Sequence, residues 1–130
     1  MNREIWEFKS EGSHLVIQAW LKDEKISPRD RAKLDRRIDN LRTMDFELLS
    51  HKLLAGPLMG TKVYKLRIFG ENRQLRPRLC RGPVGAPEDF TFLLGALEVG
   101  DRPVPSDADD AASHNRNLLI KNPNWREILT

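Results

Sequence analysis

The stretch that decides the fold runs from Val63 to Arg81 and reads VYKLRIFGENRQLRPRLCR. Residues 63–69 are rich in side chains that favour β-strands, and residues 70–72 (Gly-Glu-Asn) are typical of a turn. Residues 73–81 follow as a second strand. The stretch therefore predicts two neighbouring strands joined by a turn. Because Pro77 has no N–H to donate, we expect an edge or a bulge at that point of the second strand.

The alternation of a β-strand sorts these side chains onto two faces. One face carries Tyr64, Leu66, Ile68, Leu75 and Leu79. The other face carries Phe69 and four cations: Lys65, Arg67, Arg76 and Arg78. If the apolar face packs under helices, the four cations project together from an open face. Like charges on adjacent strands repel one another unless an anion neutralises them. The pattern therefore predicts a polyanionic ligand, and phosphate is the favoured group because guanidinium groups match its oxygens.

The positive charge of the chain is concentrated in this region. The 130 residues include 22 Lys and Arg and 19 Asp and Glu, a net charge of +3. Residues 62–81, called the basic segment below, hold seven basic residues and one acidic residue, a net charge of +6, so the remainder sums to −3. This split favours nucleic acid as a partner, with further candidate RNA-binding residues at Lys62, Arg73, Arg78 and Arg81. The alternative interpretation is a solvated sheet face without a ligand.

Length and composition restrict the class of protein. A chain with 39% hydrophobic and 32% charged residues suits one folded domain, which we place at residues 1–121 with a C-terminal tail at 122–130. The single cysteine, Cys80, can form neither an internal disulfide nor a Cys-based zinc site, and the three histidines lack the spacing of a helical metal pair. We therefore expect no metal, no cofactor, no membrane segment and a cytoplasmic location.

The flanking sequence predicts the rest of an α+β domain. Before the basic segment, start and stop signals indicate a strand at residues 5–8, a helix from Ser13 to about Asp23 and a helix from Ser27-Pro28 to about Met44. After it, they indicate an apolar strand at residues 90–97 and a last helix that opens at residues 106–110 and ends at Asn122-Pro123. The predicted order is β-α-α-β-β-β-α. We expect a small antiparallel sheet with an N-terminal helical hairpin on one face, and a C-terminal helix.

Several of these residues resemble the motifs of a known family. The Tyr64-Lys65-Leu66-Arg67 strand is followed by Leu75-Arg76-Pro77-Arg78, then by the apolar Phe92–Leu97, by Val104-Pro105, and by a helix with Ala111, Ala112 and Arg116. Over residues 3–119 this arrangement resembles the RelE/ParE toxin superfamily, and within it the phage-derived HigB-like branch. The oligomeric state is left open by this resemblance.

The resemblance implies a toxin of a toxin–antitoxin system. Such a protein is a metal-independent endoribonuclease that cuts mRNA, commonly on the ribosome, and is held inactive by a cognate antitoxin. Arg67 and Arg76 would stabilise phosphate charge, with Arg78 and Lys65 in support. Acid or base catalysis would fall to Lys65, Glu98 or a histidine, of which His114 at the start of the last helix is the best placed. The alternative for His114 is an ordinary surface residue.

The chain also departs from the family pattern. Glu98-Val99 stands where the family has a pair of lysines, which favours a catalytically inactive RelE-like module that binds a protein partner or nucleic acid. A third possibility is a phage accessory domain whose basic sheet is only a solvated surface. Residues 98–110 hold five acids against one arginine. These acids either cap the last helix or lie beside the basic sheet, where they would compete with phosphate. In the second case, neutralising Asp107, Asp109 and Asp110 tightens RNA binding.

Overall fold

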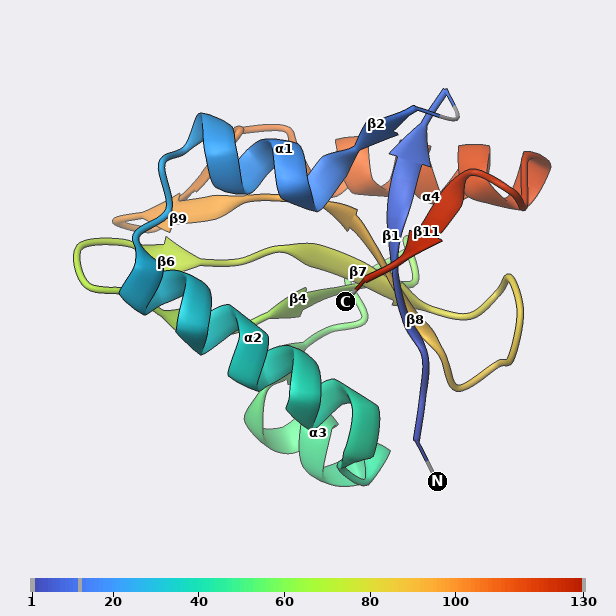
Figure 1. Ribbon diagram of the computed structural model, residues 1–130, viewed down its shortest axis with the longest axis horizontal. Helices are drawn as coiled ribbons and strands as arrows, with labels where there is room; N and C mark the ends of the chain where they lie inside the picture. The colour runs from blue at the N-terminus through green and yellow to red at the C-terminus, as the bar shows by residue number, and fades with distance from the viewer. Residues whose placement is uncertain (1, 12, 130) are drawn as a thin grey trace.

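Four helices and two β-sheets make up the part of the chain that the structure, a computed structural model, describes: residues 2–11 and 13–129 (Figure 1). The helices are α1 (Val16–Asp23), α2 (Pro28–Thr43), α3 (Phe46–Lys52) and α4 (Ala108–Lys121). The main sheet contains β11 (Arg126–Ile128), β1 (Ile5–Ser10), β8 (Phe90–Leu94), β7 (Arg78–Arg81), β4 (Val63–Leu66) and β3 (Leu54–Ala55) in that spatial order, and β2 (His14–Leu15) pairs with β1. The small sheet has the order β10 (Arg102–Val104), β9 (Leu97–Val99), β6 (Gln74–Leu75) and β5 (Ile68–Phe69).

The predicted α+β class and the C-terminal helix are confirmed, whereas the predicted antiparallel sheet is wrong at one place. β1 pairs with β8 in parallel, with Ile5 opposite Phe90, while the other neighbouring strands are antiparallel. The main sheet is therefore mixed. A parallel pair needs a long connection between its strands, and the intervening helices and strands supply one. Among the described residues, no helix is both long enough and apolar enough to cross a membrane.

The three strands predicted in the middle of the chain each break at the same level of the sheet. The first divides into β4 and β5 at Arg67, the second into β6 and β7 at Arg76-Pro77, and the third into β8 and β9 at Gly95-Ala96. β4, β7 and β8 pair with one another in the main sheet, and β5, β6 and β9 pair in the small sheet. We call this level, with Arg67, Arg76, Pro77, Gly95 and Ala96, the bend line.

Local chemistry explains why the strands break there. Pro77 cannot donate a ladder hydrogen bond, although its carbonyl accepts from the Leu66 amide at 3.0 Å. The pairing of β7 with β8 shifts register between Arg78 and Leu79, which confirms the irregularity expected beside Pro77. On the third strand, a Cβ at Gly95 would lie 2.0 Å from Cγ of Trp20, so only glycine allows α1 to approach this closely.

The helices cover both faces of the main sheet. α1, α2 and α3 lie in front of the sheet in Figure 1, and α4 lies behind it. The ring of Phe46 on α3 stacks on that of Phe90 on β8, with centroids 6.4 Å apart. Asn115 of α4 donates to the Leu93 carbonyl at 2.9 Å. The register places Lys65 opposite Arg78, so these two side chains share the α4 face. That face is covered in part by α4 and is not open as expected, because strand alternation fixes the side of each residue but not the position of a later helix.

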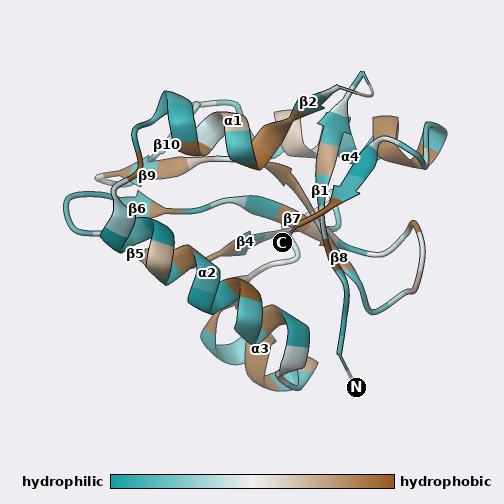
Figure 2. Cartoon of the chain, viewed as in Figure 1, coloured by the Kyte–Doolittle hydropathy of each residue, from teal (hydrophilic) through white to brown (hydrophobic). Residues whose placement is uncertain are grey.

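The second helix of the predicted hairpin, α2, begins as predicted. Ser27 caps α2 by accepting from the Asp30 amide at 3.1 Å, with Pro28 at the first helical position. The apolar stripe of α2 is buried, and the rest of this helix is coloured mostly hydrophilic in Figure 2. Burial of that stripe holds α2 to the sheet and leaves its charged side chains outside.

The start of α1 differs from the prediction, because Ser13 does not cap it. The fully buried Glu7 of β1 does so: its carboxylate accepts from the backbone amides of Ile17 at 3.0 Å and Gln18 at 3.2 Å, and from the Gln18 side chain at 3.2 Å. A carboxylate is favourable there because the N-terminal end of a helix carries unpaired N–H groups and partial positive charge. Glu7 therefore ties the first strand to the first helix.

The C-terminal tail is part of the main sheet. β11 pairs with β1 in antiparallel register, with Glu127 opposite Glu7, and Leu129 is buried. The guanidinium of Arg42 donates to the Leu129 carbonyl at 2.9 Å. Leu129 of the tail thus packs on the body, whereas Ile128 is exposed.

Replacing Glu7 tests its role in holding α1. Glu7→Ala leaves buried amides of α1 without an acceptor and should lower the free energy of unfolding by about 2 kcal/mol or more. Glu4→Ala is the matched control, since Glu4 is exposed on the same segment and should change stability by less than about 0.5 kcal/mol. Urea denaturation followed by circular dichroism measures both, and equal effects would contradict the assigned role.

Candidate nucleic-acid interface

The predicted phosphate-binding residues Arg67, Arg76 and Arg78 meet at the bend line, and we call them the arginine cluster. Arg76 is 9% exposed, and its guanidinium is held from several sides. Its Nε lies 3.2 Å from Oε2 of Glu98, and its Nη1 donates to the carbonyls of Ile68 at 3.1 Å and Leu75 at 2.9 Å. These carbonyls lie on β5 and β6, so Arg76 satisfies backbone groups next to the break in the strands.

Arg78 is held still more completely. It is 1% exposed, its Nε donates to Oδ1 of Asp109 at 2.7 Å, and its Nη1 donates to the Arg76 carbonyl. Asp109 belongs to the first turn of α4, so this ion pair joins α4 to the bend line. A guanidinium so buried and paired is not presented to a ligand in this arrangement.

The electrostatic balance of the cluster is still positive. Burial lowers the pKa of Arg76 below its ordinary value; the Glu98 carboxylate opposes this shift, and the positive charges of Arg67 and Arg78 add to it. An arginine remains charged in spite of such a shift, so the repulsion persists. Three cations and two carboxylates carry a net charge of +1, which an incoming anion would neutralise.

Arg67 and Lys65 remain accessible to a ligand. Arg67 is exposed, and its backbone amide donates to the Leu53 carbonyl at 2.8 Å. Lys65 is half-buried on β4. Among the residues that the structure describes, neither side chain forms an ion pair or a hydrogen bond. Of the four cations predicted to face outwards together, these two are the ones free to bind phosphate.

The other predicted site residues are dispersed. Arg73 bonds to Glu24 at the C-terminal end of α1, through Oε1 at 3.2 Å and the backbone carbonyl at 2.5 Å. Arg81 points to the opposite face, where its guanidinium lies 3.8 Å from the ring centroid of Phe46. Lys62 is exposed before β4, and His114 is exposed on α4. No contact among the described residues joins His114 to the arginine cluster, so the structure does not bring this candidate acid or base to the phosphate-binding arginines.

Two acidic residues of the 98–110 stretch do lie beside the basic strands. They are Glu98 and Asp109, which pair with Arg76 and Arg78. Asp107 and Asp110 are exposed and form no ion pair within the described chain. The expected position beside the basic strands is therefore confirmed for these two acids, whereas competition with phosphate stays a prediction.

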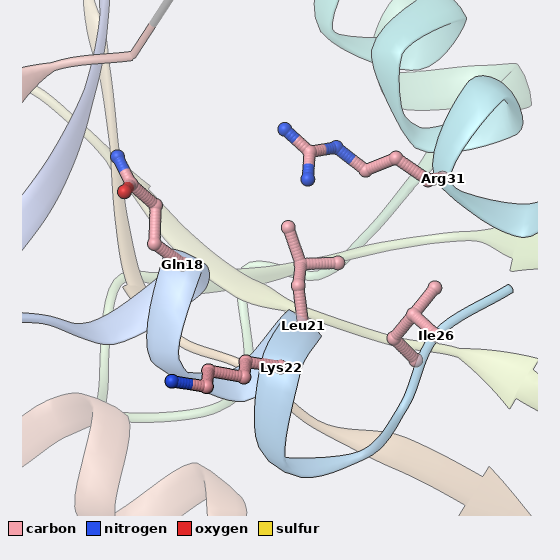
Figure 3. Close-up of a pocket in the computed structure, with 5 residues that line it drawn as sticks. All are labelled: Gln18, Leu21, Lys22, Ile26 and Arg31. Atoms are coloured by element: carbon pink, nitrogen blue, oxygen red, sulfur yellow. The ribbon is translucent and has the colours of Figure 1, made fainter. Parts of the chain in front are cut away.

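The sequence interpretation missed cations that α2 places near the small sheet. Lys33, Arg36 and Arg37 line a hollow together with Ile68 and Phe69. Another hollow of about 300 Å³ lies between α1 and α2, with Gln18, Leu21 and Lys22 on one side and Arg31 on the other (Figure 3). It contains none of the predicted site residues. Within the described residues, no group of three or more His, Cys, Asp or Glu side chains is arranged to hold a metal ion.

No protein-family model, curated protein or solved structure matches this chain. The resemblance to the RelE/ParE superfamily therefore remains a prediction from the residues of the chain itself.

The Arg78–Asp109 ion pair is expected to stabilise the folded protein. Asp109→Asn leaves a buried guanidinium without its carboxylate and should lower the free energy of unfolding by about 1–3 kcal/mol, less than for a fully buried pair because Asp109 is 45% exposed. Asp110→Asn is the control on the next residue of α4. Thermal unfolding of both variants measures the difference, and an equal loss would show that the ion pair contributes nothing.

Proposed function

We propose that this protein is a RelE/HigB-like module that binds single-stranded RNA through cations at the bend line and does not cleave it. The observation that carries the proposal is the division within the arginine cluster. Arg76 and Arg78 are occupied by Glu98 and Asp109, whereas Arg67 is exposed without a partner among the described residues. Phosphate can therefore approach Arg67, while the two buried arginines supply positive charge behind it.

The order of the elements supports the toxin-like class. β1, α1, α2, β4, β7, β8 and α4 follow one another as the predicted β-α-α-β-β-β-α order. The additional strands and α3 are short insertions between these elements or lie at their ends. On this proposal the ligands are mRNA or ribosomal RNA, and a cognate antitoxin is the expected protein partner.

Cleavage of RNA requires more than phosphate binding. A base must activate the 2′-hydroxyl, donors must stabilise the pentacoordinate phosphorane, and an acid must protonate the leaving oxygen. Nε and Nη1 of both Arg76 and Arg78 are bound to carboxylates and carbonyls of the chain, and no contact within the described residues links His114 to either arginine. RNA binding, in contrast to cleavage, does not require Arg76 or Arg78 to leave these partners.

Endoribonuclease activity is the second candidate, and one observation favours it. The side chain of Glu98 is 31% exposed and lies beside Arg76, so a carboxylate that could accept the 2′-hydroxyl proton stands next to an arginine that could stabilise charge. In this alternative, RNA displaces Glu98 from Arg76. Glu98→Gln would then abolish cleavage, because an amide cannot act as the base.

Binding of RNA is tested with a short fluorescent single-stranded RNA at several salt concentrations. Arg67→Gln should weaken binding and reduce the slope of log K against log salt by about 0.7, the loss of one phosphate contact on a single strand. Arg102→Gln is the control, because Arg102 is exposed on the small sheet and also lacks an ion pair within the described chain. Equal effects of the two changes would contradict a specific role for Arg67.

Glu98→Gln separates the two candidate functions. If the protein only binds RNA, removing this negative charge frees Arg76 and tightens binding by roughly 2- to 10-fold at low salt, without any product. Gel analysis of the labelled RNA measures cleavage in the same samples. Cleavage by the unchanged protein that Glu98→Gln abolishes would replace the binding function with the ribonuclease.

A test in cells complements the binding assay. We expect growth to continue when the unchanged protein is induced to a verified high level, since binding without cleavage leaves mRNA intact. Arrest of growth and translation, relieved by Arg67→Ala, would favour the toxin with ribonuclease activity. Arg67 suits this test better than Arg76, because its side chain is exposed and its replacement leaves the bend line in place.

A further inference from the structure

A cationic hollow lies where α2 passes over the edge of the small sheet. It has a volume of about 160 Å³ and is lined by Lys33, Arg36 and Arg37 of α2 and by Ile68 and Phe69 of β5. This space holds several water molecules at about 30 Å³ each, so it can receive a small polar group. Neither the toxin-like motifs nor the arginine cluster includes the three cations of α2.

The three cations are close to one another and incompletely paired. Arg36 and Arg37 follow Lys33 by three and four residues, so the side chains share one side of the helix. Lys33 donates to the Phe69 carbonyl at 2.9 Å and lies 3.8 Å from Asp30. Arg36 and Arg37 form no ion pair with any described residue. Like charges at this spacing destabilise a helix slightly, and a bound anion removes the repulsion.

Phe69 gives the hollow an aromatic wall. It is 64% exposed, so the ring is accessible to a ligand. The guanidinium of Arg76 lies 5.2 Å from its ring centroid and thus contacts it from the side of the arginine cluster. Phe69 therefore contacts Arg76 of the arginine cluster and also lines the hollow with the cations of α2.

We propose that this hollow is a nucleotide subsite, in which one base of a single-stranded RNA stacks on Phe69 and its phosphate is bound by Arg36 and Arg37. The proposal rests on the RNA-binding function argued above and extends it to a second point of contact. Lys33 holds the Phe69 backbone in place and adds positive charge. The strand would run past Phe69 to Arg67.

An exposed aromatic ring among cations distinguishes RNA from other polyanions. Stacking on a protein ring is a common way to bind single-stranded RNA, because every base has a π-face, and arginine forks match phosphate oxygens. An acidic peptide would need the cations but would gain little from a planar ring. The dependence of binding on both the ring and the bases therefore decides between the two ligands.

The experiment compares a short fluorescent oligouridylate with an abasic strand of equal length. Phe69→Ala should weaken binding of the oligouridylate by roughly 10-fold, within the range found for loss of one stacked base, and should leave the abasic strand almost unaffected. Phe69→Leu keeps the apolar bulk but lacks the planar face and should behave like Phe69→Ala, whereas Phe69→Trp should retain binding. Because Phe69 is exposed, these changes should leave unfolding unaltered.

The cations are tested in the same assay. Arg36→Gln with Arg37→Gln should weaken binding of both strands and lower the salt slope, while the control pair Arg102→Gln with Lys121→Gln, exposed residues outside the hollow, should do neither.

Three results would overturn the subsite. If binding of the oligouridylate depends on Arg67 but not on Phe69, Arg36 or Arg37, the RNA-binding function is retained and the proposed subsite is wrong. If polyglutamate binds as tightly as the oligouridylate and its binding is lost with Arg36 and Arg37, the hollow is a site for acidic peptides. If the unchanged protein binds no RNA at all, the proposed function and the subsite fail together.

Discussion

Two guanidinium groups hold the sheet together at the line where it bends. When strands break, their carbonyls lose ladder partners, and a buried carbonyl without a partner costs free energy. Arg76 donates to the carbonyls of Ile68 and Leu75, and Arg78 donates to that of Arg76 itself. The buried charges are then balanced by Glu98 of the small sheet and Asp109 of α4. The main sheet, the small sheet and the last helix thus meet through this one set of contacts.

The patterns that predicted the structure correctly are local ones. Ser27 and Pro28 marked the start of α2 because a cap and a fixed φ act within one turn, and alternation placed Lys65 and Arg78 on the same face. The predictions were wrong where contacts between segments far apart in the sequence determine the structure. Glu7 on the first strand caps α1 in place of Ser13, and α4 covers a face expected to be open. Such contacts depend on tertiary packing, which the spacing of neighbouring residues in the sequence does not predict.

The same distinction applies to the candidate site. The sequence grouped three arginines that the structure does bring together, but it also grouped Arg73 and Arg81, which point elsewhere. Charge alone does not separate an arginine that supports the backbone from one that faces solvent. Burial separates them: Arg78 is 1% exposed, whereas Arg67 lies at the surface. Two buried arginines behind an exposed one attract anions to Arg67, although only that arginine is accessible to a ligand.

The position of β1 in the main sheet also determines when the domain can form. Ile5 lies opposite Phe90 on one side, and Trp6 lies opposite Ile128 on the other. β1 can pair with β2 as soon as both are made, but its main-sheet neighbours β8 and β11 follow only after all of the segments between them. Loops of this length close slowly. Until then the apolar residues of β1 and its edges towards β8 and β11 remain unpaired, which favours association with other chains.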